Sequence, residues 1–476
     1  MTVLSHSESA IIIAVIIVYI LITAYLSFRW SGKSNSDYMN ASKSMPTFVL
    51  GIFLMSEYIG AQSTIGTSQK AFESGAAASW SIIAAVIGFI LYGLFFVKRL
   101  YNTGGFTISS AIEKQYGHST RMIVSIIMIY ALFLVNVNNY MSGASILVEI
   151  LGISLPVAMI IVGVVSTIYF FFGGMKSVAK VTVIHTFMKY FGIMIILAVA
   201  LTMTHGVHPM IKTLPHYYFT LSGHIGWGTI IGWILTTVGA IFSTQFLVQA
   251  ISSAKSAKSA QHASYLAAAL FIPLALAIGL IGVAARYLFP KMQSLYALPV
   301  FLSHMNVVLA AISATALVAS VFVSVSTVAL GLVSLIVDDF YVPHAHPDAK
   351  KQLRMTRVFA IIVGFLPLAF CFMAPQVLAL SFFTKALRMS ITVVAVIGFY
   401  LPWFGSTHAA NIGLIGTAIA STAWYLLGNP FGIDNIYVSL FCPIILMAVC
   451  KLWDMIFHND DHDDSNKKKQ PVKSIE

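Results

Sequence analysis

Charged residues are scarce in this sequence, and acidic residues are the scarcest of them. Asp, Glu, Lys and Arg make up 9% of the 476 residues, 27 Lys and Arg stand against 16 Asp and Glu, and hydrophobic residues reach 58%. A soluble domain carries about 25% charged residues, which keep its surface in water. The composition therefore excludes a water-soluble globular protein and predicts an all-α integral membrane protein with many spans.

Cysteines and nucleotide-binding signatures are also missing or rare. The three cysteines, Cys371, Cys442 and Cys450, all fall in apolar runs. This placement argues against a disulfide framework and against a zinc site. No loop carries a phosphate-binding motif, so direct ATP coupling is not expected. We predict no cofactor. We also predict no nucleic-acid partner, because the formal charge of +11 follows from membrane topology.

Long apolar runs fill most of the chain. Most of them reach the roughly 20 residues that a helix needs to cross a bilayer. The first run follows nine residues without a basic side chain and is too long for a signal-peptide core, so we expect it to be a retained helix. The runs predict about 13 transmembrane helices, at 10–28, 47–66, 77–97, 121–147, 155–172, 180–203, 226–252, 263–286, 306–336, 356–374, 379–401, 409–427 and 436–454.

The basic residues gather on one side of the membrane if the N-terminus is outside and the helices alternate. Inward-facing segments then carry 20 Lys and Arg, and outward-facing segments carry 4. Cytoplasmic loops show this excess in membrane proteins. We predict a multi-pass protein of the cell inner membrane with the lipid bilayer as a partner and a cytoplasmic C-terminus. The polar tail, 456–476, is predicted to be disordered, and a monomer suffices mechanically.

Five ionisable side chains fall well inside predicted helices: Glu57, His185, Lys189, Lys385 and Arg388. Such groups are costly in a bilayer and mark functional sites. Three embedded cations against one acid make a positive interior, which favours an anionic substrate such as a carboxylate. The alternatives are snorkelling of Lys385 to a near interface, a salt bridge for Glu57 and a packing role for His185.

Two predicted helices are interrupted by small and polar residues. The interruptions, GIFLMSEYIGAQSTIG at 51–66 and TTVGAIFSTQ at 236–245, open two five-helix blocks at 47–203 and 226–401. Helix breaks at matching positions of two halves indicate a binding site near the middle of the membrane. The alternative interpretation is that the small and polar residues allow close packing between helices. The candidate substrate contacts are Gln62, Ser63, Asn138, Asn139, Thr237, Gln245, Lys385 and Arg388.

Three short stretches carry a family signature: IYFFFGGMKSVAKVTVIH at 168–185, SDYMNASKSMP at 36–46 and DDFY at 338–341. Together they resemble the sodium:solute symporter family, over about residues 10–455. The resemblance implies a leucine-transporter-type core of two inverted five-helix repeats that works by alternating access. Around this core we expect an outer N-terminus, a peripheral helix and a cytoplasmic loop at 1–46, an outer loop at 204–225 and two peripheral helices at 402–455.

The resemblance also implies a sodium site, whose ligands correspond to Ser56, Ile59, Ser320 and Ser324. Val323 replaces a hydroxyl that the family has there. A hard cation needs several oxygen ligands, and a valine side chain supplies none. A second sodium site of some members uses an Asp where this chain has Thr182, which we keep as a candidate cation ligand.

Coupling to protons is the alternative to coupling to sodium. Glu57, His185 and Lys189 are titratable groups close to the expected cation site, and His185 lies one turn beyond Thr182. Lys189 is a candidate for a fixed cation in place of the sodium ion.

We therefore predict a secondary active transporter, and not an enzyme, that imports a small organic acid or an amino acid with sodium or protons. An uncoupled carrier is an alternative. A membrane enzyme is disfavoured because, of fourteen histidines, only His185 lies deep in a predicted helix. A transporter-like sensor is disfavoured because only about twenty residues follow the last helix, and a channel is disfavoured by the two broken helices.

Overall fold

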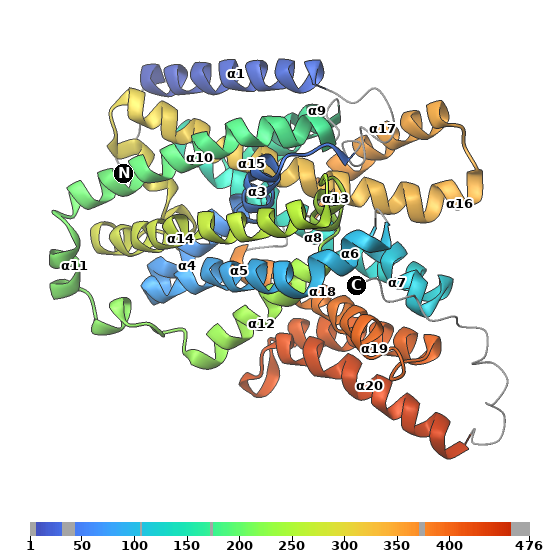
Figure 1. Cartoon of the computed structure of the whole chain (residues 1–476). Helices are drawn as coiled ribbons and strands as arrows, with labels where there is room; N and C mark the ends of the chain where they lie inside the picture. The colour runs from blue at the N-terminus through green and yellow to red at the C-terminus, as the bar shows by residue number, and fades with distance from the viewer. Residues whose placement is uncertain (1–5, 31–42, 105–106, 172–174, 371–376, 458–476) are drawn as a thin grey trace.

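The computed structural model describes residues 6–30, 43–104, 107–171, 175–370 and 377–457 (Figure 1). The side chains of Glu57, Gln62 and Val323 lie outside this description, and so does the predicted disordered tail from residue 458 onward. Every named element within the described ranges is a helix. Helices are what the apolar runs require, because a segment in lipid must satisfy its own backbone N–H and C=O groups.

The helices before residue 226 are α1 (His6–Arg29), α3 (Thr47–Tyr58), α4 (Ala61–Ser74), η2 (Ala76–Ser79), α5 (Trp80–Leu91), η3 (Tyr92–Phe96), α6 (Val97–Thr103), α7 (Ile108–Tyr116), α8 (His118–Leu151), α9 (Leu155–Phe171), α10 (Met175–Met203), α11 (Val207–Thr213) and η4 (His216–Phe219). The later ones are α12 (Trp227–Ser243), α13 (Gln245–Ser252), α14 (Ala257–Leu288), η5 (Ser294–Tyr296), η6 (Pro299–His304), α15 (Val307–Leu335), η7 (Ile336–Tyr341), α16 (Val342–Ala345), α17 (Ala349–Phe365), η8 (Leu366–Ala369), α18 (Val377–Tyr400), α19 (Thr407–Leu426), η10 (Pro430–Gly432) and α20 (Asn435–Phe457).

The described residues contain nine helices that are long and apolar enough to cross a membrane, or ten if the bent pair α12–α13 counts as one span. Two shorter apolar stretches, Thr47–Ser56 and Leu155–Thr167, add to them. The predicted all-α membrane class is confirmed, and the described part of each of the thirteen apolar runs is mostly helical. The count of thirteen spans stays a prediction.

Both interrupted segments are broken helices. α3 ends at Tyr58, Ile59 leaves the helix at φ −89° and ψ 70°, and α4 begins at Ala61. α12 and α13 meet at Thr244 with a bend of 50°. The last carbonyl groups of a helix have no intrahelical partner. Each break therefore brings unpaired backbone groups into the middle of the bundle, where a ligand or a side chain can bind them.

The helices of the bundle are buried to very different degrees. In α18, 89% of the apolar window is buried, against 22% in both α1 and α20. Figure 1 shows α1 along one edge of the bundle and α19 and α20 along the opposite edge. Among the long helices, α18 is therefore the one most enclosed by its neighbours, followed by α15 at 76%.

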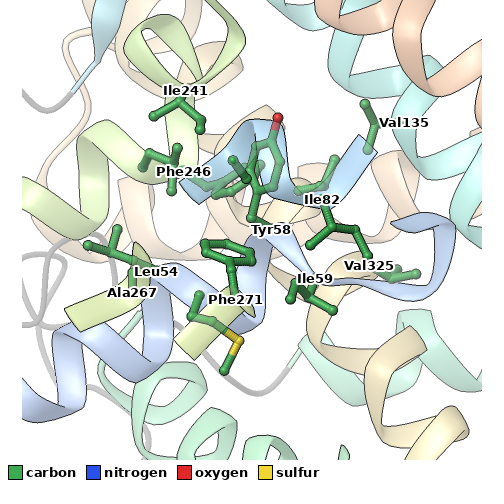
Figure 2. Close-up of a cluster of buried hydrophobic side chains, with 14 of the residues drawn as sticks. Leu54, Tyr58, Ile59, Ile82, Val135, Ile241, Phe246, Ala267, Phe271 and Val325 are labelled. Carbon is green, nitrogen blue, oxygen red and sulfur yellow. The ribbon is translucent and has the colours of Figure 1, made fainter. Parts of the chain in front are cut away.

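A buried apolar cluster surrounds the break between α3 and α4 (Figure 2). The ring of Tyr58 meets Phe89 and Phe271 edge to face, at centroid distances of 5.9 and 6.1 Å. Aromatic pairs in this geometry contribute about 0.5–1.5 kcal/mol beyond the area that they bury. The cluster therefore holds the end of α3, and with it the freed carbonyl groups, in one position.

Close packing of α14 on α4 depends on glycine. A Cβ atom on Gly282 would lie 2.4 Å from the Ser68 carbonyl oxygen and 2.6 Å from the Ala71 side chain. The backbone oxygen cannot give way, so we expect Gly282→Ala to lower the free energy of unfolding by about 1–3 kcal/mol, the usual cost of overpacking. Unfolding of the purified protein by titration with a denaturing detergent measures it.

Gly228 in α12 is the matched control, because a Cβ atom there has nothing within 4 Å. Gly228→Ala is expected to leave stability unchanged or to raise it slightly. Equal stability of the two variants would contradict the close approach of α14 to α4.

Candidate functional site

A small, narrow cavity of about 20 Å³ lies beside the break between α3 and α4. Residues of α3, α4, α8, α13, α15 and α18 form its wall. They are Tyr58, Gly60, Ser63, Val135, Asn139, Phe246, Ser324, Val328, Lys385 and Arg388. We call this space the central cavity. Of the eight predicted substrate contacts, it brings together Ser63, Asn139, Lys385 and Arg388.

Two buried cations dominate the central cavity. Lys385 and Arg388 are three positions apart on α18, share one face of the helix, and are 4% and 3% exposed. Arg388 donates from Nε to the Thr384 carbonyl at 3.0 Å and from Nη1 to the Thr244 hydroxyl at 2.8 Å. The structure thus anchors the guanidinium at the bend between α12 and α13.

The ammonium group of Lys385 lies against aromatic rings. Its Nζ is 4.3 Å from the centroid of the Phe382 ring and 5.3 Å from that of Tyr58. Cation–π contacts of this kind stabilise a desolvated cation. The described residues place no carboxylate within ion-pair distance of Lys385 or Arg388. The buried position of Lys385 between two rings does not fit the snorkelling alternative.

Asn139 and Ser63 supply the polar groups of the cavity wall. Asn139 donates from Nδ2 to Asn136 Oδ1 at 3.4 Å, while its own Oδ1 is buried without a hydrogen-bond partner among the described residues. The Ser63 hydroxyl donates to the Tyr58 carbonyl at 2.8 Å. The cavity therefore offers an unused amide oxygen opposite two positive groups, a set suited to a ligand with a negative group and a hydrogen-bond donor.

The other predicted substrate contacts do not line the central cavity. Gln245 accepts a hydrogen bond from the Ile108 backbone N–H at 2.9 Å and donates to Ser334 at 3.1 Å, which ties α13 to α7 and α15. Asn138 donates to the Val377 carbonyl at 2.7 Å. Thr237 is buried on α12. Gln62 lies in α4, and its side chain falls outside the described part of the chain.

Lys189 of α10 reaches into the break between α3 and α4. Its side chain is 0% exposed, and its Nζ donates to the Ser56 carbonyl at 3.0 Å, the Ser56 hydroxyl at 3.0 Å and the Ile59 carbonyl at 2.6 Å. Ser56 and Ile59 are two of the four predicted sodium ligands. In this structure their oxygens bind a lysine ammonium group.

The remaining predicted cation ligands lie on α15 and α10. The Ser320 hydroxyl donates to the Ala316 carbonyl at 3.2 Å, and the Ser324 hydroxyl donates to the Ser320 carbonyl at 2.9 Å. Thr182 is buried on α10, and its hydroxyl has no hydrogen-bond partner among the residues described. Ser324 also lines the central cavity, so the cation region and the cavity are neighbours.

His185 lies away from the central cavity. It is 1% exposed on α10, and its Nδ1 shares a short hydrogen bond with the Tyr19 hydroxyl of α1. Sequence reasoning missed this partner, because a tyrosine in a peripheral helix looks like an interfacial aromatic residue. The proton-coupling role of Glu57 stays a prediction, since the described part of the structure does not include its side chain.

A second charged site, which the sequence analysis missed, joins α7, α8 and η7. Asp339 is 0% exposed; its Oδ1 accepts from Arg121 Nε at 3.0 Å and Nη2 at 2.8 Å, and its Oδ2 accepts short hydrogen bonds from the Ser109 and Ser125 hydroxyls. Arg121 also donates from Nη1 to Glu113 at 2.8 Å. We call these five residues the Asp339 cluster.

Glu113 lies at the exposed rim of the Asp339 cluster. Partial burial raises the pKa of Glu113, but hydrogen bonds from His118 and Arg121 lower it by more, so the pKa lies below its usual value. A depressed pKa in the folded state stabilises the fold above the usual pKa of a glutamate. This contribution is lost as the pH falls through the lowered value.

A larger cavity, with about 710 Å³ of empty space, lies toward the end of α4. Its wall includes Gln69, Glu73, Trp233 and Phe382. Trp233 and Phe382 stack at a centroid distance of 4.8 Å and an angle of 7°. Phe382 also packs against Lys385, which lines the central cavity, so this ring connects the wall of the larger cavity to a cation of the central one.

Comparison with known proteins decides the class of this molecule. The profile of the sodium:solute symporter family matches residues 38–416. The chain belongs to this family. A sodium/glucose cotransporter of Vibrio parahaemolyticus is 23% identical over 501 aligned residues, which cover 93% of this chain and 90% of that protein.

Solved structures of transporters share the fold. A Na⁺-coupled sialic acid symporter in a substrate-bound, outward-open state superimposes with a TM-score of 0.77 at 17% identity, over 93% of this chain and 97% of the other. A nucleobase-cation-symport-1 family transporter in a closed conformation gives 0.55 at 15% identity, over 89% and 95%. At such low identity these likenesses show the fold alone.

The predicted family and fold are therefore confirmed. The chain is a multi-pass, leucine-transporter-type membrane protein. As a member of this family it is a cation-coupled solute symporter and not an enzyme. Membership of the family does not by itself specify the solute, the coupling ion or the orientation in the membrane.

Proposed function

We propose that this symporter imports a small organic anion, a carboxylate, which binds in the central cavity between Lys385 and Arg388. The observation that carries the proposal is the burial of both cations without a carboxylate partner among the described residues. Burying a charge costs several kcal/mol unless it is paired. A bound carboxylate supplies the missing negative charge, and the planar guanidinium of Arg388 can hold it through two parallel hydrogen bonds.

The polar groups of the central cavity narrow the ligand further. The unpartnered Asn139 Oδ1 fits a hydroxyl or an ammonium group of the substrate, since an amide oxygen only accepts. These features favour a small organic acid with a donor group, or an amino acid, over a neutral sugar.

The excess of basic residues in one set of loops supports an orientation for the transporter. We propose that the N-terminus is outside the inner membrane and the C-terminus is cytoplasmic. The larger cavity at Trp233 and Phe382 then faces outward, and the Asp339 cluster closes the cytoplasmic side. Residues 47–203 and 226–401 act as the two inverted repeats that alternate access to the central cavity.

Sodium and the proton are the two candidate coupling ions. The family and the Na⁺-coupled structural relative support sodium, whereas Lys189 in the predicted sodium position supports the proton. Each gradient can be imposed alone across a liposome membrane, so the two ions are separable by experiment.

Uptake of labelled compounds into proteoliposomes tests the substrate class. The panel pairs each carboxylate, such as a hydroxy acid, a dicarboxylate and an amino acid, with its neutral amide or alcohol. We expect at least one carboxylate to accumulate when a sodium or a pH gradient is imposed, and its neutral counterpart neither to accumulate nor to compete. Accumulation of a neutral sugar that no carboxylate inhibits would contradict the proposal.

A further inference from the structure

We infer that the ammonium group of Lys189 takes the place of a sodium ion in the break between α3 and α4, so that sodium does not bind there in the wild-type protein. This inference concerns the cation site alone and stands apart from the carboxylate proposal.

The position of the ammonium group supports this replacement. Lys189 Nζ lies within 2.6–3.0 Å of three oxygens, two of them backbone carbonyls of Ser56 and Ile59 that the helix break sets free. Freed carbonyls of a broken helix are the groups that take a coupling cation in transporters of this architecture. A sodium ion cannot bind the same oxygens at the same time, because the ammonium group fills the space between them and repels a second positive charge.

The hydrogen-bonding capacity of the ammonium group fits this position. An ammonium group has three N–H donors and no acceptor, and the two Ser56 oxygens and the Ile59 carbonyl oxygen each accept from Lys189 Nζ. Without the lysine side chain these buried oxygens need another cation or donor, because unsatisfied buried acceptors are costly.

Thermal unfolding in detergent tests, without any substrate, whether Lys189 occupies the sodium site. At equal ionic strength, wild type is expected to unfold at the same temperature in sodium and in potassium chloride. Lys189→Ala frees the oxygens of Ser56 and Ile59, so sodium is expected to raise its unfolding temperature above that in potassium, as a ligand of the folded state does. A sodium-specific rise in wild type would overturn the inference, whatever the substrate proves to be.

Lys180→Ala is the matched control, because Lys180 is exposed on the same helix and packs over Trp30. Like wild type, it is expected to unfold at the same temperature in sodium and in potassium chloride. Absence of a sodium-specific rise in Lys189→Ala would show that the freed oxygens do not form a sodium site, and would also overturn the inference.

Discussion

Arg388→Gln is expected to reduce uptake of the carboxylate substrate by about 100-fold or more, the loss of two hydrogen bonds to a charged group at 1.5–3 kcal/mol each. Gln keeps a polar side chain but removes the charge and the paired N–H groups of the guanidinium. Arg388 is 3% exposed and lines the central cavity, so its hydrogen bonds are made away from bulk water. Initial uptake rates over a range of substrate concentrations measure the effect.

Two further variants separate the binding role of Arg388 from its place in the fold. Arg388→Lys keeps the positive charge without the planar fork, so we expect an intermediate loss. Arg99→Gln is the control outside the cavity, since Arg99 bonds the Phe399 carbonyl and stacks on Tyr400 at the surface, and uptake should stay within about twofold of wild type. Wild-type uptake by a folded Arg388→Gln protein would remove the main support for an anionic substrate.

The helices were predictable because hydropathy and helix breaks are local properties of the sequence. The positions of the helix ends were harder to predict. The run predicted at 356–374 begins in the structure at Ala349, because the Asp348 side chain caps the helix by accepting from the Lys351 N–H. The extra turns carry Lys350 and Lys351, charged residues that a search for apolar runs leaves out.

The cations of the site were predictable, but their partners were not. Burial cost alone singles out Lys189, Lys385 and Arg388 as functional candidates. Gln245 and Asn138 were predicted as substrate contacts by a similar argument, because they are polar residues inside apolar helices. The structure instead shows both bonded to backbone groups of other segments, as is common between membrane helices. Only the packing of distant helices decides between these two uses.

The Asp339 cluster could not be predicted from charge counting. In the sequence analysis Arg121 is one of twenty basic residues that set topology. In the structure Arg121 is 17% exposed and binds a carboxylate that is 0% exposed. A count of basic residues treats an arginine in a solvated loop and an arginine that binds a buried carboxylate alike. Sequence position alone therefore does not distinguish them.

Asp339→Asn is expected to lower the free energy of unfolding by about 3–5 kcal/mol, the cost of breaking a buried ion pair by removing one partner. The substitution removes the charge that Arg121 pairs with and turns an amide N–H₂ toward the donors of Arg121, Ser109 and Ser125. Unfolding by titration with a denaturing detergent measures the change in the purified protein.

The neighbouring aspartate offers a matched control for that loss. Asp338 Oδ2 is buried without a hydrogen-bond partner among the described residues, and the carboxyl of Asp338 lies close to the like charge of Asp339. Asp338→Asn therefore removes a formal charge at the neighbouring position without breaking a hydrogen bond of this oxygen, and should not lower stability by more than about 0.5 kcal/mol. An equal loss in both variants would mean that net charge, and not the contacts of Asp339, stabilises this end of the bundle.

A double substitution then tests whether the cluster acts as a unit. Replacing both members of a buried ion pair by apolar residues of similar size is often neutral, whereas removing one member leaves the other charge buried. Arg121→Met with Asp339→Leu should therefore be more stable than either single variant, and a double-mutant cycle gives the coupling energy between the two positions. Because this pair joins α8 to η7 across the end that we propose to be cytoplasmic, the double variant should also open that end more readily. Faster efflux of the transported compound from preloaded proteoliposomes would reveal this, and additive losses of stability with unchanged efflux would show that Arg121 and Asp339 do not close the transporter together.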